Sequence, residues 1–171
     1  MKKVIIALAL LAVTFNMKAE DKKEQSTKPV ILNAGIGVSN WGLPIFLGVD
    51  FYLTEIISGG VMAGFSTKDF GAGKYTVMGG VLRGNYHYGQ RLKGIPEKMD
   101  LYAGLNLGYY ALSYKVNGNK VTGVGIDNGF LALAGQAGMR YKLSSKLSGL
   151  AEVGGGAGIS GLRLGISYNI K

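Results

Sequence analysis

The chain has no cysteine, one histidine and three prolines among its 171 residues. Without cysteine it cannot have a disulfide scaffold, a thiolate zinc site, a cysteine nucleophile or a cysteine-linked lipid anchor. A single histidine excludes metal sites built from several histidines. Charged residues make up 17% of the chain, below the share of about a quarter that is usual for soluble globular proteins. We therefore predict no catalytic residues, no metal site and no cofactor site.

The first 19 residues have the pattern of an export signal. Lys2 and Lys3 precede an apolar run of about ten residues, 4–13 (VIIALALLAV), which is too short to span a bilayer comfortably. We expect residues 1–19 to be a signal peptide, the alternative being an N-terminal anchor helix. Its removal lowers the formal net charge from +9 to +6, because it carries three lysines and no acid. Residues 20–28 are charged and lack periodicity, which predicts a flexible segment before a single domain over 29–171.

From Val30 onward, apolar residues recur at every second position, which is typical of β-strands. In the last segment, Leu162, Leu164 and Ile166 share one face, and Arg163, Gly165 and Ser167 share the other. Eight such segments occur, at 30–38, 45–52, 57–66, 78–88, 100–110, 131–142, 147–157 and 162–171. Beyond the N-terminus no run of about 18 apolar residues is present, which excludes a protein with several membrane-spanning helices.

The connections between these segments alternate in length. The connections 54–55 and 143–146 are short, whereas 67–74 and 116–129 are longer. Hairpins inserted into a membrane from one side show this alternation, although the connection 89–98 is long for a turn on the short side. The loops expected at the cell surface are short, with 116–129 the longest, so we expect no large recognition surface.

The alternation alone does not say which face of a barrel points inward. A soluble lipocalin-like barrel has an apolar interior, and an outer membrane barrel has the reverse arrangement. The polar faces carry about half the charge that a water-exposed surface needs. Aromatic residues gather at strand ends, where membrane girdles form: Phe51, Tyr86, Tyr88, Tyr141 and Tyr168 at one rim, and Trp41, Phe65 and Phe130 at the other. The sequence predicts an all-β fold, an eight-stranded antiparallel up-and-down transmembrane β-barrel, with a soluble barrel as the alternative.

Three stretches carry a resemblance to a known family. They are residues 80–88 (GVLRGNYHY), 95–109 (IPEKMDLYAGLNLGY) and 165–171 (GISYNIK). The chain resembles the small eight-stranded outer membrane barrels of the OmpX and OmpA-barrel type, and especially the short outer membrane β-barrel domain proteins of Bacteroidota. One departure is that many such proteins end in an outward aromatic residue read by the barrel-assembly machinery. This chain ends in Lys171, and its outward candidates are Tyr168 and Ile170.

The resemblance implies a location in the cell outer membrane, with both termini in the periplasm. It implies contact with outer membrane lipid and lipopolysaccharide, and with the barrel-assembly machinery during insertion. The function expected is non-enzymatic: a structural or accessory subunit, or a small adhesion module. The alternatives are a barrel enzyme acting on lipid or lipopolysaccharide, and a soluble periplasmic binding barrel.

Polar residues on the inward positions form the first candidate site. A barrel of eight strands has room for side chains but not for an open channel, so its ionisable groups must pair. We expect a lumenal polar network of Asp50, Arg83, Asn85, Asn106, Gln136, Arg140, Glu152 and Arg163. If the last hairpin turns at Ala157 and Gly158, Glu152 lies opposite Arg163, although registers shifted by two are also consistent. The alternative to a structural role is a proton or ion path.

Small residues on the outward positions of the sixth and seventh segments form the second candidate site. Small side chains permit close approach between membrane proteins. We expect this face to dock a larger outer membrane protein complex, although abundant glycine could equally explain it. The residues are Gly135, Ala137, Gly149, Ala151, Gly155 and Ala157.

Three other patterns carry less weight. His87 has no serine beside it in the sequence, which argues against acyl chemistry. Residues 156–161 (GAGISG) match a dinucleotide-binding pattern, but a strand follows where that site needs a helix. Lysines and arginines form no stripe interleaved with aromatics, so nucleic acid is not an expected partner.

Overall fold

The computed structural model describes residues 29–71, 73–117, 119–121, 129–156 and 161–170, and they form a single β-barrel. The predicted signal peptide and the segment 20–28 lie outside the described residues. Besides a short 3-10 helix, Gly89–Arg91, the described elements are all strands. Their bounds are β1 Val30–Ser39, β2 Ile45–Tyr52, β3 Ile57–Phe70, β4 Gly73–His87, β5 Met99–Val116, β6 Asn119–Lys120, β7 Phe130–Lys142, β8 Leu147–Gly156 and β9 Gly161–Asn169.

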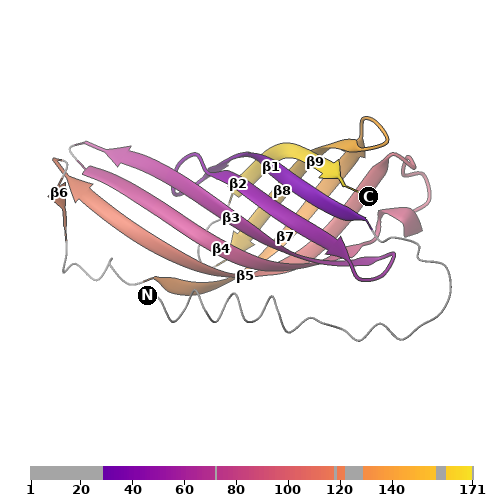
Figure 1. Cartoon of the computed structure of the whole chain (residues 1–171), viewed down its shortest axis with the longest axis horizontal. Coiled ribbons are helices and arrows are strands. Elements are labelled where there is room, and N and C mark those ends of the chain that lie inside the picture. Colours follow the sequence, from indigo (N-terminus) through magenta and orange to yellow (C-terminus); the bar gives the residue numbers. More distant parts are fainter. Residues whose placement is uncertain (1–28, 72, 118, 122–128, 157–160, 171) are drawn as a thin grey trace.

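Eight of these strands close the barrel, and each pairs antiparallel with its neighbours. The order around the wall is β1-β2-β3-β4-β5-β7-β8-β9, and β9 returns to pair with β1 (Figure 1). Closure removes the open edges that lipid does not tolerate. The predicted fold class is therefore confirmed. Among the described residues, no helix has the length and apolar character needed to cross a membrane.

The strand faces have the orientation that the sequence predicts. Leu133 and Leu164 point away from the barrel axis and are 59% and 51% exposed. Arg83 and Glu152 point inward and are 4% and 1% exposed. Apolar side chains on the outside and charged side chains inside are the reverse of a water-soluble barrel.

The two ends of the barrel differ. Val30 of β1 lies opposite Phe51 of β2, and the amide of Ile170 donates to the Val30 carbonyl. The first and last described residues of the chain therefore lie at the same end of the barrel as the connections 53–56 and 143–146. We name this the turn end. At the other end, β3, β4 and β5 reach far beyond their neighbours (Figure 1). We name this extension the blade; it comprises residues 66–70, 73–77, 111–116 and β6.

The blade corrects two expectations from the sequence. The connection expected over 67–74 is mostly strand, because β3 continues to Phe70 and β4 begins at Gly73. Within the connection expected over 116–129, β6 pairs with the end of β5. Strands rather than loops therefore build the surface at this end, and it extends further than the short loops expected from the sequence.

The aromatic residues also differ from expectation at this end. Phe51, Tyr86, Tyr141 and Tyr168 face outward at the turn end and are 40–46% exposed. Trp41 and Phe130, expected on the outward face near the other rim, instead pack against the buried interior cluster. Phe130 lies opposite the inward-facing Tyr110, which fixes its side on the inner face. The outward aromatics near the blade are Phe65 and Tyr109.

Candidate functional site

Five charged side chains from five strands form an alternating chain across the barrel lumen. Arg140 of β7 binds Asp50 of β2, and the Nε atom of Arg83 on β4 lies 3.5 Å from Asp50 Oδ1. Arg83 also binds Oε1 of Glu152 on β8, whose Oε2 lies 3.3 Å from Nε of Arg163 on β9. Each side chain points inward because it occupies a polar position of an alternating strand.

Each of these five charged side chains contacts a side chain of opposite charge. A third carboxylate, Asp100, lies at the turn end, with Oδ2 at 3.7 Å from Arg140 Nη1. Three guanidinium groups therefore face three carboxylates. Buried ions are tolerated only when they are paired and hydrogen-bonded, because desolvation otherwise outweighs their attraction.

The register of the last hairpin is the one predicted from the sequence. Glu152 lies directly opposite Arg163, and the outward-facing Val153 lies opposite Leu162. The predicted carboxylate–guanidinium contact is therefore present across this strand pair. Arg83 reaches Glu152 from the far wall of the barrel, a contact that strand pairing does not supply.

A polar layer near the turn end holds Asp50 and Arg140 in place. The side-chain amide of Asn33 donates to Asp50 Oδ2 at 2.9 Å, and the Ser167 hydroxyl donates to Asn33 Oδ1 at 2.6 Å. Arg140 Nε donates to the Ser167 oxygen at 3.3 Å. These neutral groups satisfy part of the remaining hydrogen-bonding capacity of the ion pair.

A second polar layer consists mainly of amides. Asn106 Nδ2 and Arg163 Nη2 both donate to Gln136 Oε1, at 2.8 and 3.0 Å. Gln136 Nε2 in turn donates to Asn85 Oδ1, and Asn85 Nδ2 donates to Ser58 Oγ. A side-chain amide has fixed donors and acceptors and does not ionise in the physiological range, so this layer is poorly suited to a proton path.

Tyr102 fills the middle of the lumen and is fully buried. Its hydroxyl donates to Glu152 Oε1 at 2.6 Å, and the Arg140 guanidinium lies 4.8 Å from the centre of its ring. Gly138 lies opposite Tyr102 on β7, and a Cβ there would collide with the ring. Glycine at this position therefore makes room for the aromatic side chain.

Ser58, His87 and Asp100 form a hydrogen-bonded chain near the turn end. Ser58 Oγ lies 2.9 Å from His87 Nε2, and Asp100 Oδ1 lies 2.9 Å from His87 Nδ1. The sequence pattern does not reveal this arrangement, because Ser58 is 29 residues away from His87 and comes close only through the pairing of β3 with β4. Such a chain can activate a serine nucleophile. Ser58, however, is completely buried, so a substrate carbonyl has no access to its oxygen.

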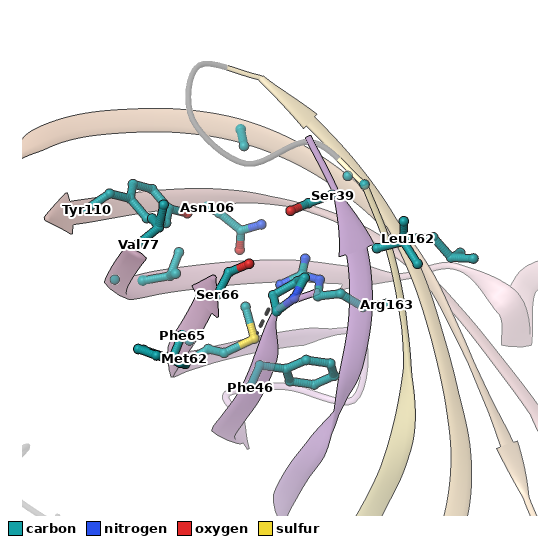
Figure 2. A pocket seen from close by; sticks show the side chains of 18 of the residues that line it. Ser39, Phe46, Met62, Phe65, Ser66, Val77, Asn106, Tyr110, Leu162 and Arg163 are labelled. Carbon is teal, nitrogen blue, oxygen red and sulfur yellow. Dashed lines mark hydrogen bonds between the residues drawn. The ribbon is translucent and has the colours of Figure 1, made fainter. Parts of the chain in front are cut away.

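The lumen towards the blade is apolar, which the sequence analysis did not predict. Phe46, Met62, Val77, Val81 and Tyr110 are buried there on positions that the alternation assigns to the interior. They line a cavity of about 60 Å³ whose polar lining includes Arg163 and Asn106, and Figure 2 shows Arg163 beside Met62. A cavity of this size with polar groups in its lining has room for water.

The structure brings all eight predicted network residues together. Seven are buried, and the Arg163 side chain is 18% exposed. Further members that the prediction omitted are Asn33, Ser58, His87, Asp100 and Ser167. Their positions in the alternation place them inside, but the alternation does not specify their depth along the barrel.

Most of the predicted docking face can be placed on the structure. Gly135 and Ala137 on β7, and Gly149, Ala151 and Gly155 on β8, occupy outward positions of two paired strands. Gly135 lies opposite Gly155, whereas the other three lie opposite Val153, Tyr141 and Met139, respectively. Ala157 lies outside the described residues. Among the described residues, no group of three or more His, Asp or Glu side chains has an arrangement that could hold a metal ion.

The fold is that of outer membrane β-barrels. No family model and no curated protein sequence matches the chain, so the narrower resemblance to the Bacteroidota family has no support from these comparisons. Among solved structures, the chain is similar to the N-terminal β-barrel domain of Pseudomonas aeruginosa OprF, with a TM-score of 0.60 and 16% identity over 84% of this chain and 98% of that one.

Two further structures are similar to a comparable extent. Neisserial surface protein A has a TM-score of 0.61 and 10% identity, over 83% of this chain and 96% of that one. Ail, the attachment invasion locus protein of Yersinia pestis, has a TM-score of 0.53 and 12% identity, over 84% of this chain and 97% of that one. At these identities the likeness shows the fold alone.

Proposed function

We propose that this chain is a non-enzymatic integral protein of the cell outer membrane, with both termini in the periplasm. The observation that carries the proposal is the inside-out distribution of side chains. Leu133, Leu164 and Ile166 are 51–59% exposed around a lumen that contains paired arginines and carboxylates. An apolar outer wall is stable in lipid, whereas in water it would cause aggregation.

A structural role is favoured over an enzymatic one by the filling of the lumen. Charged, amide and aromatic side chains occupy it, and the Ser58 oxygen is inaccessible to substrate. The same filling argues against diffusion of solutes through the barrel. The signal peptide 1–19 and the barrel-assembly machinery account, in this proposal, for export and insertion.

A folded barrel should show heat-modifiable migration. We expect the unheated protein to migrate in a denaturing gel at a different position from the boiled protein, because closed strand pairing resists detergent. Cell fractionation should place the protein in the outer membrane, with the mature chain beginning at Glu20. A single gel position with and without heating, together with recovery in the soluble periplasmic fraction, would contradict the proposal.

We further propose that the outward small residues of β7 and β8 dock a larger outer membrane protein complex. Gly149 has nothing within 4 Å of the position of an added Cβ, and Gly135 has only a backbone oxygen, so the surface is shallow and open there. Close backbone approach between membrane proteins needs such a surface. The barrel then acts as an accessory subunit.

Larger side chains on this face should release the partner. We expect the double variant Ala137→Leu with Ala151→Leu to lose proteins that co-purify in mild detergent with the unmodified barrel. The matched control is Ala34→Leu with Ala111→Leu, which adds the same volume on outward positions elsewhere. Unchanged co-purification with the first variant would show that this face docks nothing.

A further inference from the structure

From the barrel wall into the blade, the outward face of β3, β4 and β5 changes from apolar to cationic over three successive rows of side chains. The first row is Phe65, Met78 and Ala111, and the second is Thr67, Thr76 and Ser113. The third row is Asp69, Lys74 and Lys115. Residues directly opposite one another in paired strands share a face, so each row lies at one depth.

The third row contains an imbalance of charge. Lys74 lies opposite Lys115 on one side and opposite Asp69, the one acid in the row, on the other. The Lys74 ammonium is 3.8 Å from Asp69, and both side chains are more than half exposed. Like charges that face each other across strands destabilise a sheet, so an anion at this row would relieve the repulsion. We name Lys74 and Lys115 the lysine row.

The lysine row lies beyond the apolar band, within reach of lipid phosphates. Two residues advance about 7 Å along a strand, or about 5 Å along the axis of a barrel with strands tilted by about 40°. The apolar band ends at the row of Phe65 and Met78. The lysine row therefore lies about 10 Å beyond the end of this band. Lysine side chains at this height can reach back towards the headgroup layer.

A second feature lies on the same wall and includes Phe65 and Met78 of the first row. Outward-facing Leu47, Phe65, Met78 and Tyr109 surround Ala63 and Gly80, whose small size leaves a shallow apolar groove of about 520 Å³. We name these six residues the lipid groove. A Cβ added at Gly80 would meet nothing within 4 Å, so the groove is open at that point. In a bilayer, such a groove is filled by acyl chains.

We propose that the lipid groove and the lysine row together bind one phosphate-bearing lipid of the outer leaflet. An acyl chain occupies the groove over Gly80, and the lipid phosphates contact Lys74 and Lys115. The hydroxyl row between them offers hydrogen bonds to the sugar or glycerol part of the headgroup. This inference rests on the proposed membrane location and names the lipid chemistry that one side of the barrel selects.

The test uses the mature full-length barrel in detergent, with native mass spectrometry to count retained lipid. The probes are lipid A carrying both phosphates and the same lipid without phosphates. We expect Lys74→Gln with Lys115→Gln to weaken retention of the phosphorylated lipid roughly twentyfold, since each lysine near an anionic surface adds about a fivefold preference. Retention of the dephosphorylated lipid should not change.

Filling the groove separates the acyl contribution from the charge contribution. Gly80→Leu should weaken retention of both lipids, because leucine occupies the space of the acyl chain. The matched controls are Lys93→Gln with Lys98→Gln in the connection between β4 and β5, and Gly84→Leu, where an added Cβ also meets nothing within 4 Å. Neither control should change lipid retention.

Two results would overturn the inference while leaving the membrane barrel intact. One is equal retention of the two lipids by the unmodified protein. The other is release of the phosphorylated lipid by inorganic phosphate alone, which would indicate a site for free anions. Heat-modifiable migration of each sample shows whether the barrel is folded, so failure of the lipid site is distinguishable from failure of the proposed function.

Discussion

Replacing Glu152 with alanine is expected to lower the free energy of unfolding by about 3–5 kcal/mol, because it removes one partner from a buried ion pair. Arg83 and Arg163 both bind this carboxylate, and the Tyr102 hydroxyl donates to it. The variant leaves two guanidinium groups and one hydroxyl without their common acceptor. Urea-induced unfolding in detergent micelles, followed by the fluorescence of Trp41, measures the change.

The matched control removes a carboxylate that the lumen does not use. Glu55 lies exposed in the connection between β2 and β3, and Glu55→Ala should change stability by less than about 0.5 kcal/mol. A similarly small change for Glu152→Ala would show that the charge chain contributes little to stability.

Replacing Leu105 with arginine is expected to lower the free energy of unfolding in lipid vesicles by about 2–4 kcal/mol, the cost of a cation at the midplane on the lipid face of a barrel. Leu105 is 62% exposed and lies midway along the outward face of β5, between Leu101 and Tyr109. Its cross-strand partners are Gly84 and Gly135, which offer no compensating charge. Reversible unfolding of the barrel in vesicles measures the change.

Leu105→Met is the control for this substitution. It conserves volume and apolar character, so we expect a change below about 1.5 kcal/mol. If the outer wall faced water, Leu105→Arg would increase solubility without destabilising the barrel. That result would contradict the membrane location.

The face of most strand residues could be predicted from the sequence because a strand alternates with a period of two, although Trp41 and Phe130, expected on the outward face, pack against the interior. The alternation places Leu133 and Glu152 on opposite sides, and closure is expected because lipid does not tolerate open edges, an even number of strands being consistent with closure. The pairing of Glu152 with Arg163 could also be predicted from the sequence, because a short hairpin restricts the register to a few possibilities. These features depend only on neighbours in the chain.

Contacts across the lumen could not be predicted from the alternation within each strand. Arg83 and Glu152 are 69 residues apart, and Asp50 and Arg140 are 90 residues apart. The stagger of all intervening strands decides which inward side chains reach the same depth. The same limitation hid the proximity of Ser58, His87 and Asp100.

The blade escaped prediction for a different physical reason. Outside the apolar band both faces of a strand can contact water, so the outward face no longer has to be apolar. Thr67, Thr76 and Ser113 break the alternation while remaining strand residues. A loss of pattern was therefore interpreted as a loop, although the hydrogen-bonded ladder continues.

The charge chain has a consequence for the order of assembly. Asp50 and Arg83 come from the first half of the chain, whereas Arg140, Glu152 and Arg163 come from its last three strands. An incomplete barrel that lacks its final hairpin would hold Arg83 in an interior without the Glu152 carboxylate. Pairing of β9 with β1 therefore closes the wall with the same strands that bring the Glu152 carboxylate to Arg83 and the Arg140 guanidinium to Asp50.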